Sequence, residues 1–300
     1  MKTTARSVTR RPICIRNNLK RARTLRKDRL YLITGQVHVP SGVRLNIEDG
    51  VRIGILNGPL PGCRLGHAAL IFDAGSILDA QRFAVYAAAR DGRPQKKPDN
   101  GGIWFFGGHQ SVCKDGLRHK KSRRTALSHF SSKAISTHYL GCAEAEDLDA
   151  VSVMGVGISE WHIEALHIRR SGDDALDLER SDIQLRRVVI HNPTEDALNI
   201  SSSHLEITDS LKVHMAIRGE PEKTKPDALD RDIFDLEVDD SPSYVSLQRG
   251  ALVELSGVFG DELRLSTRDI PPFQKKGRAS YRFSGRSARA KTTIYSRDQD

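Results

Sequence analysis

A short motif recurs in the middle of this 300-residue chain at a nearly constant spacing. The segment DALDL at residues 174–178 returns as DALNI at 196–200, which is 22 residues later, and DAVSV at 149–153 precedes it by 25 residues. Repeats of this length are supersecondary units that bury their apolar side chains only by stacking on one another. The spacing therefore predicts an elongated stack of similar coils.

The segments between these copies have the pattern of β-strands. Residues 161–163 (WHI), 183–185 (IQL) and 205–207 (LEI) each place a polar residue between two apolar ones. This alternation is typical of a half-buried strand and does not follow the 3.6-residue period of a helix. Strands that return every 22 residues are expected to pair in parallel, one coil on the next. The predicted interior columns are Val151, Leu176 and Leu198, followed by Val153, Leu178 and Ile200.

The N-terminal third shows the same short strands between sharp turns. In residues 31–56 (YLITGQVHVPSGVRLNIEDGVRIGIL) the turns 40–42 and 48–50 interrupt the apolar runs, and a similar turn follows at 73–75. With the repeat, this organisation resembles the right-handed parallel β-helix of the pectin-lyase-like superfamily. The resemblance covers residues 31–265 and implies an all-β, single-stranded solenoid with insertions at its corners. By analogy with that fold alone, it also suggests an extracellular or cell-surface protein.

Three polar stretches break the period and are predicted to be corner insertions, which solenoids tolerate well. They are residues 91–100, 109–147 and 215–232. The two ends of the chain are strongly basic. Residues 1–30 carry a net charge of +10 and are predicted to be a disordered tail, whereas residues 266–300 are predicted to form a basic cap or tail.

The charge is distributed very unevenly along the chain. The total is +9 at pH 7 and residues 264–300 contribute +7, which leaves −8 on residues 31–263. The basic ends, together with the tract HKKSRR at 119–124, are suited to a polyanion such as nucleic acid. No apolar run reaches the roughly 18 residues of a membrane span, and the N-terminus lacks the apolar stretch of a secretory signal. The four cysteines show no C-x-x-C spacing, which predicts neither a zinc site nor a disulfide framework.

The candidate site follows from strand parity around the repeat. If Leu176 and Leu178 point inward, their neighbours point outward and form an acidic groove beside a floor of small residues (Ala150, Ala175 and Ala197). The predicted ligand-binding residues are Asp173, Asp177, Glu195 and Asn199. The catalytic candidates are Asp173, Asp177, Glu179 and Glu195. Asp173 and Glu195 would be stacked like charges, an arrangement that raises a carboxyl pKa or recruits a cation such as Ca²⁺.

A purely structural interpretation competes with the groove. Asp149, Asp174 and Asp196 occupy equivalent corner positions, where aspartate commonly accepts hydrogen bonds from backbone N–H groups. By the same parity, His167, His191 and His204 are expected on different faces and predict no metal cluster.

Comparison with the enzymes of the superfamily favours a non-catalytic protein. Residues 172–174 (GDD) look like the paired aspartates of polygalacturonases, but the preceding coil offers DLD at 147–149 in place of Asn-Thr-Asp. The Gly-His-Gly and Arg-Ile-Lys motifs of those enzymes do not appear. The leading prediction is therefore a binding or surface-display module for a polysaccharide or other extended polymer. The alternatives are a polysaccharide hydrolase or lyase that uses the acidic groove, and a polyanion-binding or nucleic-acid-binding protein that uses the basic tails and insertion.

Overall fold

The computed structural model is an all-β structure. It describes residues 11–60, 66–108, 113–114, 117–118, 127–142, 148–215, 232–237, 241, 243–247, 252–259, 273–275 and 280–287. Within these residues there is no helix, and so no helical segment that could cross a membrane.

Three long sheets of parallel strands contain almost all of the regular structure. Sheet A contains β1 (Ile13–Ile15), β3 (Leu30–Ile33), β6 (Val51–Leu56), β9 (Arg82–Ala88), β14 (Ala134–His138), β17 (Ala165–Arg169), β19 (Asp182–His191), β21 (His204–Met215), β23 (Tyr244–Leu247), β24 (Leu252–Phe259), β25 (Phe273–Lys275) and β26 (Ser280–Ser287). Sheet B contains β2 (Arg23–Leu25), β5 (Arg44–Ile47), β8 (Ile77–Ala80), β13 (His129–Ser132) and β16 (Trp161–Ile163). Sheet C contains β4 (Gln36–Val39), β7 (Ala69–Phe72), β10 (Ile103–Phe106), β15 (Val151–Met154), β18 (Leu176–Glu179), β20 (Leu198–Ser201) and β22 (Phe234–Glu237).

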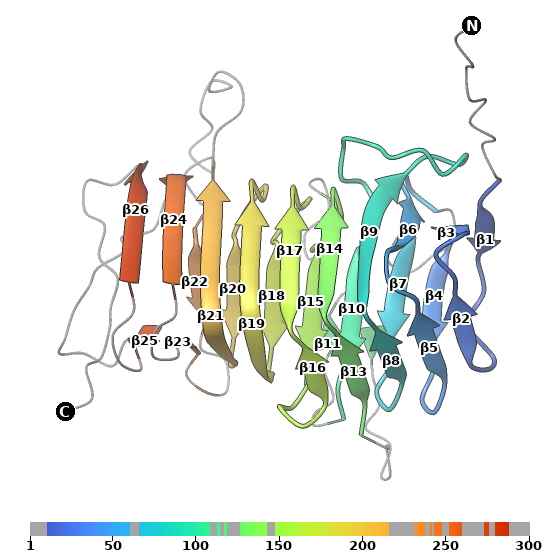
Figure 1. Cartoon of the computed structure of the whole chain (residues 1–300), viewed down its shortest axis with the longest axis horizontal. Helices are drawn as coiled ribbons and strands as arrows, with labels where there is room; N and C mark the ends of the chain where they lie inside the picture. The colour runs from blue at the N-terminus through green and yellow to red at the C-terminus, as the bar shows by residue number, and fades with distance from the viewer. Residues whose placement is uncertain are drawn as a thin grey trace, which may run out of the picture.

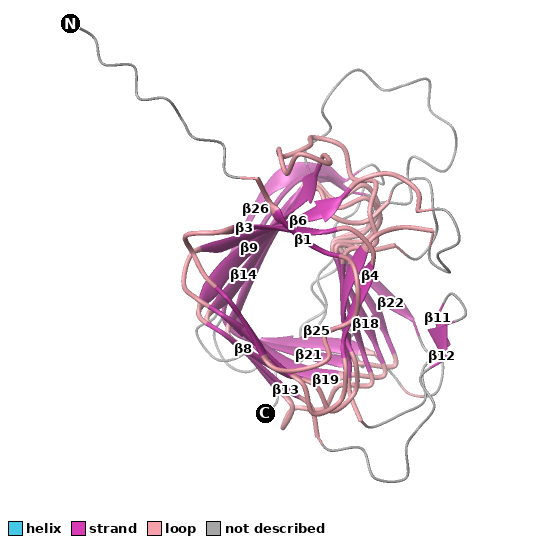
Figure 2. Cartoon of the chain, turned by 90° about the vertical axis from the view of Figure 1, so that its right-hand side faces the viewer, coloured by secondary structure: helices cyan, strands magenta, loops and turns pink. Residues whose placement is uncertain are grey.

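The chain visits the three sheets in turn. From β3 to β17 each strand of sheet A is followed by one of sheet C and then one of sheet B, and each strand pairs with its equivalent one circuit earlier. Figure 1 shows the strands of sheet A side by side in chain order, and Figure 2 shows the three sheets around a common interior. This all-β parallel architecture is compatible with a parallel β-helix or a similar solenoid.

The predicted interior columns are confirmed. Val151 pairs with Leu176, which pairs with Leu198, and the next column of Val153, Leu178 and Ile200 is paired in the same way. All six side chains are fully buried in the main core. Trp161 also belongs to this core, as the alternation around it indicates.

Left-handed backbone conformations mark the corners. Arg170 and Asn192, which follow strands of sheet A, have φ values of 58° and 52°. Arg180 and Ser202, which follow strands of sheet C, have φ values of 46° and 47°. Within each pair the two residues are 22 positions apart. Positive φ is uncommon for residues other than glycine. Its recurrence shows that the corners, like the strands, repeat from coil to coil.

A second apolar cluster lies outside the main core, on the outer face of sheet C. It consists of Ala69, Ile71, Trp104, Phe106, Cys142, Leu148 and Met154, all of which are buried. The segment 103–106 is therefore a strand buried on both faces. The antiparallel pair β11 (Cys113–Lys114) and β12 (Leu117–Arg118) lies on the outer side of sheet C (Figure 2).

Several segments differ from the predicted domain boundaries. Residues 11–30, which were predicted to be part of a disordered tail, contain β1 and β2, because Ile15, Leu19 and Leu25 are apolar side chains that enter the core between basic residues. The predicted insertion 109–147 contains β13 and β14, which are regular members of sheets B and A. The remaining tail residues 1–10, the basic tract 119–124 and most of the predicted insertion 215–232 lie outside the described residues.

The stacked interior predicts a sharp position dependence for charged substitutions. Leu176→Asp should lower the free energy of unfolding by more than about 4 kcal/mol, because it removes a buried side chain and buries an unpaired charge. Val189→Asp, on the partly exposed outer side of β19, is the matched control and should unfold close to the wild-type temperature. Thermal unfolding followed by circular dichroism measures both, and equal tolerance of the two changes would contradict the stacked core.

Candidate functional site

The outer side of sheet A carries a concentrated group of imidazole and basic side chains. One outward row runs across four neighbouring strands through His138, Arg169, His191 and His214, which are directly paired in register. A second row, two residues earlier on each strand, runs through Ser136, His167, Val189 and Lys212. We call the group formed by His138, His167, Arg169, His191, Lys212 and His214 the histidine face.

Strand alternation explains why these side chains share one face. The residues between them, such as Ile168, Ile190 and Val213, are buried in the main core. His167 and His191 are both exposed on the outer side, which corrects the expectation that they lie on different faces. Strand parity fails here because the alternation is interrupted where the chain passes from sheet B to sheet A: Ala165 and Leu166 are both buried, and Arg186 and Arg187 are both exposed.

Partial burial, and after it the neighbouring positive charges, hold the imidazole pKa values of this face down. The pKa of His138 is lowered by partial burial and then by the nearby Arg169 and Arg52. Partial burial also lowers the pKa of His167 and of His191, with Arg187 contributing for His167 and His214 and Arg169 for His191. These imidazoles are therefore largely neutral at pH 7 and become charged on acidification or when an anion approaches.

The basic side chains of the face differ in their pairing. Lys212 forms an ion pair with Glu254 at 2.7 Å, and Arg187, at the edge of the face, pairs with Asp209 at 2.7 Å. Arg169 has no acidic partner among the described residues, and it lies in the middle of the row of histidines. Its charge is therefore available to an external anion.

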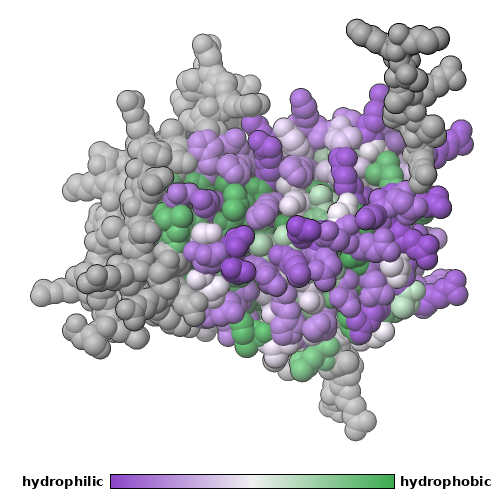
Figure 3. Space-filling view, viewed as in Figure 1, coloured by the Kyte–Doolittle hydropathy of each residue, from purple (hydrophilic) through white to green (hydrophobic). Residues whose placement is uncertain are grey.

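A loop sets one end of the histidine face. On the strands of sheet A that precede β14, the outer side is covered by the segment that follows β9. In that segment, the carbonyl of Gly92 accepts a hydrogen bond from the Tyr86 hydroxyl at 3.1 Å. Tyr86, Leu32 and Ala88 are buried beneath it as a small separate cluster. Figure 3 shows this side of the molecule, on which hydrophilic side chains predominate over the described strands. The face thus begins where the loop ends.

The predicted acidic residues gather at a different place, the corner that leads into sheet C. Asp149, Asp173, Asp174 and Asp177 are all buried, whereas Glu195 is exposed. Carboxylate oxygens of Asp173, Asp174 and Glu195 lie within 4.8 Å of one another, so one proton or one cation can bridge them. We call the group formed by Asp149, Asp173, Asp174, Glu195 and Asp196 the acidic corner.

Burial and mutual repulsion raise two pKa values in the acidic corner. The pKa of Asp173 is raised to about 9 by burial first and then by the charges of Asp149, Asp174 and Glu195, with a hydrogen bond to Glu195 adding to the effect. The pKa of Asp196 is raised to about 8, mainly by burial and by Asp174. Both side chains therefore hold protons at neutral pH.

Hydrogen bonds from the next coil hold two aspartate side chains of the acidic corner in place. The Asp174 carboxylate accepts hydrogen bonds from the Asp196 backbone N–H and from the Asn199 side-chain amide, both at 2.9 Å. The Asp196 carboxylate accepts one from the Asp232 backbone N–H at 2.5 Å. Asp174 and Asp196 thus cap backbone groups of the following coil, in line with the structural interpretation, whereas Asp149 accepts a hydrogen bond from the Ser152 hydroxyl in its own coil at 2.8 Å.

The structure separates the predicted site residues by their accessibility. Asp177 is only 3% exposed and Asp173 only 8%, and Glu179 is held by Arg180 at 2.7 Å, so these carboxylates do not line an open groove. Ala150, Ala175 and Ala197 belong to the main core, which corrects the predicted outer floor. Strand parity does not extend to them because each alanine belongs to the corner and precedes the first residue of its strand.

The histidine face was not predicted from the sequence. The signal was present, because His138, Arg169, His191 and His214 recur at intervals of 31, 22 and 23 residues, each at or next to the end of a strand of alternating pattern. No protein-family model matches the chain, and neither the curated proteins nor the solved structures include a significant match.

The protonated acids of the corner predict how stability depends on pH. The folded chain holds protons that the unfolded chain releases above a pKa of about 3.8, so the free energy of unfolding should fall as pH rises from 7 to 8, above the range in which the histidines with lowered pKa values contribute the opposite slope. Asp173→Asn should remove one proton's contribution, about 1.4 kcal/mol per pH unit, from that slope.

Chemical denaturation at several pH values measures this slope. Asp79→Asn, at an exposed carboxylate in sheet B, is the matched control and should leave the slope as it is. A stability that rises with pH across this range, or an unchanged slope in Asp173→Asn, would contradict the assignment.

Proposed function

We propose that the three sheets form a right-handed parallel β-helix of the pectin-lyase-like kind, and that this protein is a non-catalytic module that binds an acidic polysaccharide along its histidine face. The observation that carries the proposal is the in-register row of His138, Arg169, His191 and His214 across four adjacent strands. The proposal keeps the polymer-binding function expected from the sequence and assigns it to a different surface.

The spacing of the row suits an extended ligand. Neighbouring parallel strands lie about 4.8 Å apart, so the four side chains present polar groups at regular intervals along the axis of the stack. A polymer that lies along this axis meets one such group on each coil. Imidazoles and guanidinium groups donate hydrogen bonds to carboxylate or sulfate oxygens, and a guanidinium can do so with two bonds at once.

Electrostatics favour an anionic polymer over a neutral one. Arg169 supplies a positive charge, and an anion that approaches His138 or His191 raises its pKa and so promotes protonation. Binding is then coupled to proton uptake. The affinity should therefore increase as the pH falls below neutrality, and it should decrease with salt because the charges are exposed.

The first test compares binding of polygalacturonate at pH 5.5 and pH 7.5 by isothermal titration calorimetry. The wild-type chain should bind more tightly at pH 5.5, and replacement of His138, His191 and His214 by Gln should weaken binding at that pH at least 10-fold and flatten the pH dependence. The matched control replaces His129 and His162, an exposed pair on sheet B, by Gln and should bind like the wild type.

Several outcomes distinguish this proposal from the alternatives. Equal binding by the two histidine variants would contradict the assignment of the face. Tighter binding of single-stranded DNA than of polygalacturonate would favour the polyanion function predicted from the basic segments. Binding of neutral dextran that is as tight as that of polygalacturonate would contradict the electrostatic argument.

Glycan cleavage by the acidic corner is the second candidate function. The observation in its favour is that Asp173 remains protonated at neutral pH beside the exposed Glu195, since a general acid next to a carboxylate base is the pair that glycosidases use. The spacing weighs against it, because these oxygens approach within 4.8 Å, less than the roughly 5–5.5 Å of retaining or 6.5–9.5 Å of inverting enzymes.

An assay of reducing ends and of unsaturated products separates the two functions. Incubation with polygalacturonate should release neither product if the protein only binds. Cleavage by the wild-type chain that is lost in Asp173→Asn and in Glu195→Gln would support the second candidate and contradict a non-catalytic module.

A further inference from the structure

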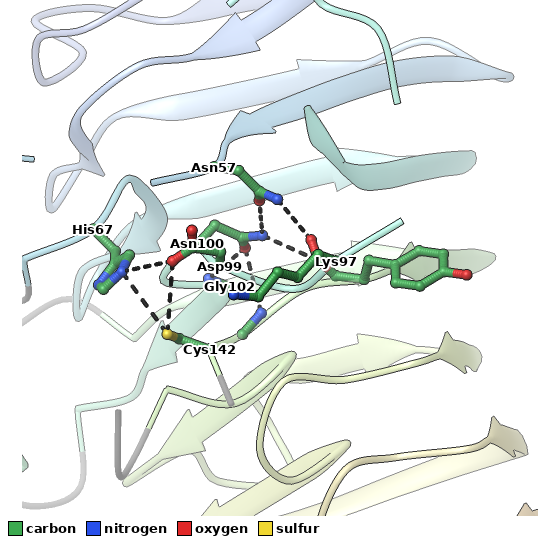
Figure 4. Close-up of polar contacts among 9 residues, drawn as sticks. Asn57, His67, Lys97, Asp99, Asn100, Gly102 and Cys142 are labelled. Carbon is green, nitrogen blue, oxygen red and sulfur yellow. Dashed lines mark hydrogen bonds and ion pairs between the residues drawn. The ribbon is translucent and has the colours of Figure 1, made fainter. Parts of the chain in front are cut away.

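Three side chains with metal-binding atoms converge on one point from three successive coils (Figure 4). His67 lies just before β7, Asp99 lies before β10, and Cys142 follows β14. The His67 Nε2 atom is 3.1 Å from Asp99 Oδ1 and 3.8 Å from Cys142 Sγ, and Asp99 Oδ1 is also 3.8 Å from Cys142 Sγ. The three atoms therefore form a small triangle.

The triangle has the wrong geometry for a nucleophilic relay. In a Cys-His-Asp triad one ring nitrogen faces the thiol and the other faces the carboxylate. Here the same nitrogen, Nε2 of His67, faces both Sγ and Oδ1. In addition, Cys142 is only 4% exposed, which limits the access of a substrate to the thiol.

The triangle does have the geometry of a chelate. Zinc binds thiolate sulfur at about 2.3 Å, imidazole nitrogen at about 2.0–2.1 Å and carboxylate oxygen at about 2.0–2.2 Å in a tetrahedron, which separates neighbouring ligand atoms by roughly 3.3–3.6 Å. The observed separations of 3.1 and 3.8 Å lie close to these values. An ion placed over the triangle would need only small movements of the side chains.

A network of hydrogen bonds holds the backbone on either side of the ligands. Asn100 is fully buried, and its side-chain amide donates to the Tyr139 carbonyl at 3.1 Å. Its side-chain oxygen accepts hydrogen bonds from the N–H groups of Gly102 and Gly141 at 3.2 and 3.3 Å. Asn100 follows Asp99 directly and Gly141 precedes Cys142, so one side chain fixes two of the three ligand-bearing segments.

Further contacts fix the remaining segments. The Gly101 N–H donates to the carbonyl of Ala68, the residue after His67, at 2.7 Å, and the Gly58 N–H donates to the Asp99 carbonyl at 2.7 Å. A side chain at Gly172 would come within 2.2 Å of the Cys142 backbone nitrogen, so this coil packs directly against the cysteine. The ligand atoms are therefore positioned before any ion arrives, which is the condition for tight binding.

We propose that His67, Asp99 and Cys142 bind a zinc ion. One thiolate, one imidazole and one carboxylate are a donor set that zinc accepts, and a soft thiolate disfavours Ca²⁺ and Mg²⁺. The His67 and Asp99 side chains are 13% and 30% exposed, so the ion reaches the site from solvent and its fourth position remains open to water or another ligand. The ligands are 32 and 43 residues apart, which is why the search for local cysteine spacing predicted no zinc site.

The test is a zinc titration of the chelator-treated full-length chain against a chromophoric indicator. The wild-type chain should bind one zinc ion tightly, and Cys142→Ser, Asp99→Asn and His67→Gln should each weaken that binding at least 10-fold. Cys14→Ser, which changes an exposed cysteine far from the cluster, is the matched control and should bind zinc like the wild type.

Cobalt substitution gives a readout that does not depend on affinity. Co²⁺ should produce a thiolate-to-metal charge-transfer band that is absent in Cys142→Ser and retained in Cys14→Ser, and zinc should displace it. Circular dichroism of the metal-free variants checks their folding, and if Cys142→Ser does not fold, a changed cobalt spectrum in Asp99→Asn provides the same test. Failure of the wild-type chain to bind zinc, or a charge-transfer band that survives in a folded Cys142→Ser, would overturn the proposal.

Discussion

The parallel backbone pairing of each coil with the next is the constraint on which the rest of this structure depends. A residue on one strand has its neighbours one circuit away in the sequence, as Leu176 has in Val151 and Leu198. Apolar residues at these positions form interior columns, and polar residues between them form outward rows. Residues that are distant in the sequence therefore act together, and every cluster described above arises in this way.

The same constraint makes the corner before sheet C the chemically richest part of the chain. In the early coils it brings together His67, Asp99 and Cys142. In the later coils it holds the acidic corner, where repetition of aspartate at one position stacks like charges and protonation relieves the repulsion. The Asp174 and Asp196 side chains accept hydrogen bonds from backbone N–H groups of the next coil. The aspartate at this corner position therefore links its coil to the following one.

The sequence was sufficient to predict the all-β class, the parallel pairing and the interior columns around residues 149–207, because the period is regular there and the alternation is clear. It was insufficient where the period changes. The alternation is interrupted at Ala165 and Leu166 and again at Arg186 and Arg187, so the expected placement of the histidines was wrong, and corner alanines were assigned to a strand that begins one residue later.

The candidate sites were harder to predict than the fold. Asp173 and Glu195 were correctly expected to lie together, but the pKa of Asp173 is raised first by burial and only then by the neighbouring charges of Asp149, Asp174 and Glu195. Burial was not predictable, because whether an outward side chain is exposed depends on loops that have no period. The zinc ligands were missed because they lie in corners of three coils with unequal lengths, and only the three-dimensional register brings them together.

The proposed function requires that stacked coils present His138, Arg169, His191 and His214 to one extended anion. Titration of the histidine imidazoles by NMR, with and without polygalacturonate, tests it most directly, with single His→Gln variants used to assign the signals. Polygalacturonate should raise the pKa values of His138 and His191 and leave that of His129, on sheet B, unchanged. Unchanged pKa values at His138 and His191, or an equal rise at His129, would contradict it.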